Sequence, residues 1–452
     1  MEKMKKLIGA LLLLALLASC GGKTEEDRTE TNLPDGTSQV TETGKPENQN
    51  PETENSETEK PEPQNNGELF DFVMDRWKNG STEALYPYLS DEMTALCDSD
   101  TLKRMFEDIT DTFGAIAAND EPQITAVDGI DVYSSTVRLE HADADVTLSL
   151  KGTKIYGFTD DVRFTGEFDV THAGIRQHYF LLNGLNAVYT CAESSERAPA
   201  VLMISGSGPC DYNGTVGMLA PMEDMAQKLA EQGISSLRLE KRTLRYASDF
   251  KATDGIEEEY FKDCRAALSY LKEQEGTDGV YLLGYSLGGQ IAAALAAEDD
   301  SIAGMVLLMS TARHLADILC DQYTAAEPLG AEVFAQYRDA AKAQADGAAT
   351  GQYYFGATDA YWASYNALDT IESIRIAAIP TAIINSTGDN QIFDADISLW
   401  SDSFSKDENV ILTVFDDMSH FGYKIDTRDT SLLYKAAEMP DELIEAIVQA
   451  IR

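Results

Sequence analysis

Positive charge is scarce in this chain of 452 residues. Its 35 Lys and Arg stand against 77 Asp and Glu, which gives a formal net charge of −42 at pH 7. Proteins that bind nucleic acids neutralise phosphates with clustered Lys and Arg, so the charge argues against a nucleic-acid partner. Histidine is scarcer still, with five residues, and few side chains are therefore candidates for a general base.

Cysteine is sparse as well, with six residues in the whole chain. Setting Cys20 aside leaves an odd number of widely spaced cysteines, which fits neither a disulfide framework nor a metal-ligand pattern. No Gly-rich phosphate loop or acidic metal motif stands out. The sequence therefore predicts neither a metal nor a cofactor.

Long apolar runs are missing too, and the run at residues 7–17 is too short to cross a bilayer comfortably. It follows several lysines and precedes small residues, as in a secretory leader over residues 1–19. The leader ends in Leu17-Ala18-Ser19-Cys20, which resembles the lipobox of bacterial lipoproteins. This resemblance implies an exported protein that is anchored to the membrane by lipid on Cys20. An ordinary signal peptide with an incidental cysteine is the alternative.

Two composition changes divide the rest of the chain. Residues 20–66 are rich in Glu, Thr, Asn and Pro and cannot bury enough apolar surface to offset the entropy of ordering, so we expect a disordered acidic tether. In residues 67–160, helical patterns precede strands of period two, which predicts a small α+β domain. Its layout resembles a small NTF2-like domain of unknown function found in exported bacterial proteins.

From residue 165 to 452, strand and helix patterns alternate, which predicts an α/β fold with a mostly parallel sheet and helices on both faces. Between residues 311 and 369 lies a helical insertion rich in Tyr, Phe and Trp. We expect this insertion to form a cap. Its aromatic side chains either line an apolar acyl pocket or pack the cap onto the body.

The pattern Gly284-Tyr285-Ser286-Leu287-Gly288 joins a predicted buried strand to a predicted helix. In this context Gly-X-Ser-X-Gly is typical of a nucleophile elbow, where the serine takes a strained conformation and the glycines let strand and helix pass close together. The alternative is an ordinary strand-to-helix turn. The pattern predicts that Ser286 is a nucleophile.

A nucleophilic serine needs a histidine base that is held by a carboxylate, and in such folds the chain order is serine, acid, histidine. Asp389 follows a predicted strand at 379–385, with Asp394 and Asp396 as alternatives. His420 follows the last predicted strand and is the last histidine in the chain. We therefore expect Ser286, Asp389 and His420 to form a catalytic triad.

Acyl transfer also needs donors aimed at the developing oxyanion. We expect the backbone N–H of Leu287 to be one, and the loop 205–209 to supply the other, with Ser207 favoured over Gly208. Lys241 and Arg242 follow the next predicted strand. They could bind a substrate carboxylate, but we expect them to pair with nearby acidic side chains.

These motifs together resemble the α/β-hydrolase superfamily over residues 165–452, and most closely its exported bacterial members similar to serine aminopeptidases, dienelactone hydrolases and the acyl-CoA thioester hydrolase C-terminal domain. The resemblance rests on Gly206-Ser207-Gly208-Pro209, the run 238–242, the elbow, Asp389 and His420. It implies an α/β-hydrolase fold and a serine hydrolase that cleaves a small carboxylic ester or related acyl substrate. An exopeptidase or amidase of the same fold, and a catalytically silent envelope-binding protein, are the alternatives.

Overall fold

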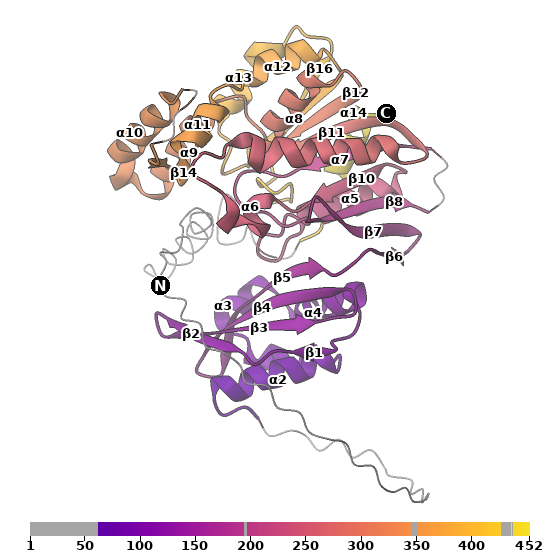
Figure 1. The fold of residues 1–452 in the computed structure, drawn as a ribbon, viewed down its shortest axis with the longest axis vertical. Coiled ribbons are helices and arrows are strands. Elements are labelled where there is room, and N and C mark those ends of the chain that lie inside the picture. Colours follow the sequence, from indigo (N-terminus) through magenta and orange to yellow (C-terminus); the bar gives the residue numbers. More distant parts are fainter. Residues whose placement is uncertain (1–61, 194–196, 346, 348–349, 426–434, 436) are drawn as a thin grey trace, which may run out of the picture.

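The computed structural model describes residues 62–193, 197–345, 347, 350–425, 435 and 437–452. The predicted leader, Cys20 and the tether as far as residue 61 lie outside this part of the chain. The described residues form a small part with its own antiparallel sheet and a larger part built on a second sheet (Figure 1). No helix within these ranges is long and apolar enough to cross a membrane.

The small part places its helices before its sheet, as the periodicity predicts. Each α-helix begins with a side chain that accepts a hydrogen bond from the first turn, namely Asn65, Ser90 and Asp98. The elements are α2 (Asn66–Lys78), the 3₁₀ helix η1 (Thr82–Tyr88), α3 (Asp91–Leu96), α4 (Ser99–Phe113), β1 (Ala118–Asn119), β2 (Gln123–Val127), β3 (Ile130–Arg138), β4 (Ala142–Lys151) and β5 (Lys154–Phe164).

The large sheet has nine strands within the described residues, in the order β16-β15-β12-β11-β9-β10-β8-β7-β6. Neighbouring strands from β16 to β10 are parallel, and β8, β7 and β6 complete the sheet with antiparallel pairings. The predicted mostly parallel sheet is confirmed. The strands are β6 (Phe168–His172), β7 (Ile175–Leu182), β8 (Leu185–Ala192), β9 (Ala198–Ile204), β10 (Ser235–Leu239), β11 (Thr277–Tyr285), β12 (Ile302–Leu308), β15 (Thr381–Ser386) and β16 (Val410–Phe415).

Helices cover both faces of this sheet, as predicted. One face packs against α5 (Pro221–Glu231) and α14 (Asp441–Ile451). The other face packs against α7 (Lys262–Glu273), α8 (Leu287–Glu298), α12 (Thr370–Ala377) and α13 (Asp394–Phe404). Short helical segments, α6 (Arg242–Arg245), the 3₁₀ helix η2 (Ala247–Asp249) and the π-helix η3 (Glu257–Phe261), connect β10 to α7.

The predicted cap is helical apart from one short hairpin. It contains α9 (Leu315–Ala326), the 3₁₀ helix η4 (Pro328–Gly330), α10 (Ala331–Lys342), the strands β13 (Tyr353–Tyr354) and β14 (Ala357–Thr358), and α11 (Asp359–Tyr365), which form a lobe at one end of the large part (Figure 1). Its aromatic side chains are a mixture: Trp362 and Tyr365 are buried, whereas Tyr337 and Tyr353 are exposed.

The first helix of the cap, α9, has His314 as its N-cap. Its Nδ1 accepts a hydrogen bond from the N–H of Ala316, and its Nε2 lies 2.7 Å from Oδ1 of Asn366. Partial burial lowers the pKa of His314 below 6.5, and Lys342 adds to this effect, although Asn366 and Asp317 oppose it. On acidification the unfolded chain takes up this proton first, so His314 contributes a loss of stability as the pH drops below 6.5.

We expect His314→Asn to reduce this loss of stability, because asparagine caps a helix without titrating. When the pH is lowered from about 7.5 to about 5.5, the change in melting temperature should be less unfavourable in the variant than in the wild-type protein. Equal changes in the two proteins would contradict this role of His314.

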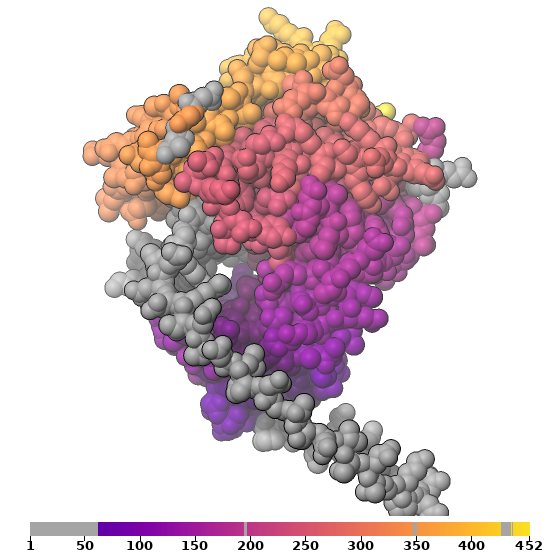
Figure 2. All heavy atoms as spheres, in the orientation of Figure 1, coloured from indigo at the N-terminus to yellow at the C-terminus, as the bar shows by residue number. Residues whose placement is uncertain are grey.

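One apolar cluster spans the two parts. Tyr179 of β7, Val188 of β8 and the loop residue Tyr212 belong to the buried cluster of the small part. The ring of Phe164 lies 5.4 Å from that of Tyr179 and 5.2 Å from that of Tyr212. The side chain of Asn186 also bonds the backbone of β5, at Phe164 N (3.1 Å) and Val162 O (2.6 Å). On the face in Figure 2, the two parts form one continuous surface.

Candidate active site

Ser286 lies between the end of β11 and the start of α8, in a conformation that is rare for a residue with a side chain. Its φ is 55° and its ψ is −123°. The bond from its N–H to the carbonyl of Leu308 (2.9 Å) holds it there. Such strain persists only where the surroundings over-determine it, and it is frequent at functional sites.

The glycines on either side of Ser286 are required by close packing. A Cβ on Gly284 would lie 2.3 Å from the carbonyl oxygen of Gly288, and a Cβ on Gly288 would lie 2.2 Å from that of Ile204. Both distances are far below van der Waals contact. The glycine spacing therefore lets α8 cross directly over β11 and β9, which presents Ser286 at the carboxyl end of the sheet.

The structure brings Ser286, His420 and Asp389 together from three separate loops. His420 Nε2 lies 3.1 Å from the hydroxyl of Ser286, and His420 Nδ1 lies 2.7 Å from Oδ2 of Asp389. Asp389 is fully buried and His420 is nearly so. A neutral imidazole that carries its proton on Nδ1 donates to Asp389 and leaves Nε2 free to accept from the serine.

Backbone donors fix the acid. Oδ1 of Asp389 accepts from the N–H groups of Gln391 (2.7 Å) and Ile392 (3.0 Å), which leaves Oδ2 for the histidine. Ser386 ties this loop to the loop of His420, because its hydroxyl accepts from both Gly388 N (3.0 Å) and Met418 N (3.1 Å). The distance between acid and histidine thus depends on a serine that the sequence motifs did not single out.

The two alternative acids have other surroundings. Asp394 is exposed in the first turn of α13. Asp396 is buried, but it bonds the hydroxyl of Thr311, the N–H of Phe393 and the guanidinium of Arg313 at the base of the cap. Of the three candidates, Asp389 is the one that contacts His420.

The loop 205–209 follows β9 and lies against the nucleophile. A Cβ on Gly206 would lie 3.1 Å from Cβ of Ser286 and 3.5 Å from its hydroxyl oxygen. The N–H of the next residue, Ser207, has no acceptor among the described residues. Leu287 is the first residue of α8, where N–H groups have no partner inside the helix. Both predicted oxyanion donors are therefore close to Ser286 along the chain or in space.

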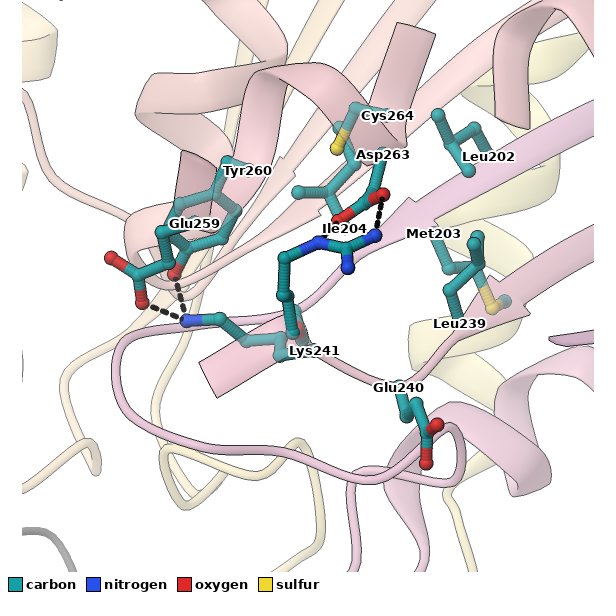
Figure 3. A pocket seen from close by; sticks show the side chains of 12 residues that line it. Leu202, Met203, Ile204, Leu239, Glu240, Lys241, Glu259, Tyr260, Asp263 and Cys264 are labelled. Carbon is teal, nitrogen blue, oxygen red and sulfur yellow. Dashed lines mark hydrogen bonds and ion pairs between the residues drawn. The ribbon is translucent and has the colours of Figure 1, made fainter. Parts of the chain in front are cut away.

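Lys241 and Arg242 pair with acidic side chains, as predicted. Lys241 bonds Glu259 (2.5 Å), and Arg242 bonds both oxygens of Asp263 (2.9 and 2.7 Å). Both pairs line a small pocket beside the loop 205–209 (Figure 3). Glu259 and its neighbour Tyr260 are polar groups of this region that sequence reasoning missed, because nothing in the run 257–261 distinguishes them from ordinary helix residues.

Gln290, on the first turn of α8, anchors the cap and was also missed. Its amide nitrogen bonds the carbonyls of Thr311 (2.9 Å) and Arg313 (3.0 Å), and its oxygen accepts from the hydroxyl of Tyr365 (2.5 Å). The helix that carries Ser286 at its N-terminus therefore also holds both ends of the cap.

Among the described residues, no group of three or more His, Cys, Asp or Glu side chains could hold a metal ion.

Comparison with known proteins agrees with this architecture. A family model described as the alpha/beta hydrolase fold matches residues 232–330, which include the elbow. Esterase EstD of Thermotoga maritima is 27% identical over 328 residues, which are 71% of this chain and 79% of the relative.

Two solved structures are similar over about the same share of the chain. Est1E from Butyrivibrio proteoclasticus is 15% identical, with 64% of this chain and 99% of that chain covered and a TM-score of 0.39. An esterase of Pyrococcus furiosus is 14% identical, with 63% and 90% covered and a TM-score of 0.40. The strand order, the elbow and the family-model match together identify this chain as one with the α/β-hydrolase fold.

Proposed function

We propose that the protein is a serine hydrolase that cleaves a small carboxylic ester or related acyl compound through an acyl-enzyme. The proposal rests on one observation: the hydroxyl of Ser286 contacts His420, and His420 in turn contacts Asp389. The likeness to an esterase from Thermotoga maritima supports the ester class.

In the proposed reaction His420 Nε2 takes the proton of Ser286 while Oγ attacks the acyl carbon. Asp389 stabilises the imidazolium and keeps its orientation. The N–H groups of Leu287 and Ser207 bind the oxygen that becomes negatively charged. As the carbon–oxygen ester bond breaks, His420 returns the proton to the leaving alcohol. Water, deprotonated by the same histidine, then releases the acid and restores Ser286.

The proposal includes export and attachment to a membrane through lipid on Cys20. Its support is the sequence pattern at residues 1–20. The long acidic stretch that follows would separate the hydrolase from the membrane surface. A dissolved small substrate could then reach the active site.

A fluorophosphonate probe tests the proposed nucleophile. We expect the full-length protein to form a stable adduct on the peptide that contains Ser286, because the probe traps a serine activated by a base. The His420→Ala variant should form no adduct. A folded protein that reacts at no serine, or at a serine other than Ser286, would refute the proposed chemistry.

The substrate class is tested by comparing a simple aryl ester with an aminoacyl arylamide. We expect kcat/KM to be higher for the ester. Faster turnover of the arylamide would replace the ester proposal with an exopeptidase of the same fold.

A further inference from the structure

A buried ion pair lies directly behind the loop 205–209. Lys241 follows β10, and its Nζ lies 2.5 Å from Oε1 of Glu259, 2.8 Å from the hydroxyl of Tyr260 and 3.1 Å from the carbonyl oxygen of Gly206. The exposed fractions of Lys241, Glu259 and Tyr260 are 5%, 8% and 3%. All three protons of the ammonium group thus have acceptors inside the protein, so this lysine is not available to a substrate carboxylate.

Two of these groups converge on one acceptor. The hydroxyl of Tyr260 accepts from Lys241 and donates to the carbonyl oxygen of Gly206 at 2.5 Å. The same oxygen accepts from Lys241. One backbone carbonyl is therefore held by a charged donor and by a second donor that is polarised by that charge.

The local helix geometry serves this arrangement. Glu259 and Tyr260 lie in the π-helical turn η3, which precedes α7. These two neighbours in the turn both reach Lys241. Single π-helical turns are uncommon and are frequent at functional sites.

The held carbonyl shares a peptide unit with the N–H of Ser207. A trans peptide is planar, and its C=O and N–H point in opposite directions. A carbonyl of Gly206 fixed toward Lys241 therefore fixes the N–H of Ser207 toward the opposite side. Gly206 itself lies against Ser286, and the N–H of Ser207 has no acceptor among the residues that the structure describes.

We propose that Lys241 and Tyr260 are positioning residues that hold the peptide between Gly206 and Ser207, so that the N–H of Ser207 is aimed at the oxyanion formed on the acyl carbon. Glu259 orients the ammonium group of Lys241. The inference rests on the proposed hydrolase function and names the groups that set one of its oxyanion donors. The positive charge also polarises the peptide and makes its N–H a stronger donor.

The energetics of a buried ion pair favour a role beyond stability. Removing Lys241 and Glu259 from water is costly, and buried pairs of this kind can often be replaced by neutral groups with little loss of stability. The proposed role in orienting the N–H of Ser207 explains why Lys241 and Glu259 are buried here, whereas packing alone does not.

The test compares two variants with a matched control in the full-length protein. Tyr260→Phe removes one hydroxyl and keeps the ring. Lys241→Met combined with Glu259→Gln removes both charges together, so that no buried charge is left unpaired. The control is Arg242→Met combined with Asp263→Asn, which removes the neighbouring ion pair of the same pocket but touches neither Gly206 nor its bonds.

The readouts are kcat and KM for p-nitrophenyl acetate and the inhibition constant of an aryl trifluoromethyl ketone, which forms a tetrahedral anion on the nucleophile. We expect kcat to fall about tenfold in Tyr260→Phe and about a hundredfold in the double variant, with KM nearly unchanged. The reason is that the N–H of Ser207 stabilises the oxyanion in the transition state, so its misalignment slows the reaction without weakening substrate binding. The inhibition constant should rise by the same factors, and the control should change neither value.

The outcomes separate this inference from the proposed function. Unchanged kcat and inhibition constant in folded Tyr260→Phe overturn the positioning role, even if its melting temperature falls, and this variant alone decides the matter should the double variant fail to fold. A wild-type protein that neither hydrolyses the ester nor forms the fluorophosphonate adduct on Ser286 overturns both.

Discussion

Ser286→Ala is expected to lower ester turnover about a million-fold, as the loss of a nucleophile that works as a unit with its base can do. Alanine keeps the backbone of the elbow and removes the one atom that attacks the acyl carbon. The measurement is kcat for p-nitrophenyl acetate with purified full-length protein.

The matched control for this change is Ser269→Ala, an exposed serine on α7 whose hydroxyl bonds the carbonyl of Arg265. It should leave kcat unchanged. If purified Ser286→Ala retained more than a few per cent of wild-type turnover, the nucleophile would have to be sought elsewhere.

Asp389→Asn should lower kcat about ten-thousand-fold while leaving the fold intact. The amide that replaces Oδ2 can donate to Nδ1 of His420, which shifts the imidazole proton to Nε2. A protonated Nε2 cannot accept the proton of Ser286, 3.1 Å away. The variant therefore keeps all three side chains in place but holds the base in the wrong tautomer.

Asp394→Asn provides the comparison, since it makes the same chemical change five positions along the chain at an exposed site. It should retain wild-type kcat. Comparable losses in the two variants would show that general electrostatics near the loop, and not the contact between Asp389 and His420, accounts for the effect.

The sequence predicts the large sheet well because strands and helices have different apolar patterns there. Strands buried on both faces are short continuous apolar runs, and the longer helices between them carry one apolar stripe, so length and pattern together separate strand from helix. The elbow is equally visible in the sequence, because positions 284 and 288 require glycine. A Cβ at either position would lie only 2.2 to 2.3 Å from a backbone oxygen.

Contacts that depend on three-dimensional placement were not predictable in the same way. The position of Asp389, Asp394 and Asp396 in one short segment leaves three candidate acids, and burial with two backbone donors distinguishes the first of them. The π-helical turn has no sequence signal separate from that of a helix. The sequence therefore does not distinguish Tyr260 from an apolar helix residue, although its hydroxyl bonds Gly206 beside Ser286.

The apolar cluster that spans the two parts has a consequence for the order in which the chain folds. Phe113 and Phe164 precede Tyr179, Val188 and Tyr212 in the chain but belong to the same buried cluster, and both phenylalanine rings contact Tyr179. During synthesis the N-terminus is made first, so the helices and strands of the small part can form early. One side of that part stays apolar and uncovered until β7, β8 and the loop after β9 have been made. We therefore expect the fold of the small part to be completed only when the larger part is made, and synthesis halted between the two to leave an aggregation-prone surface.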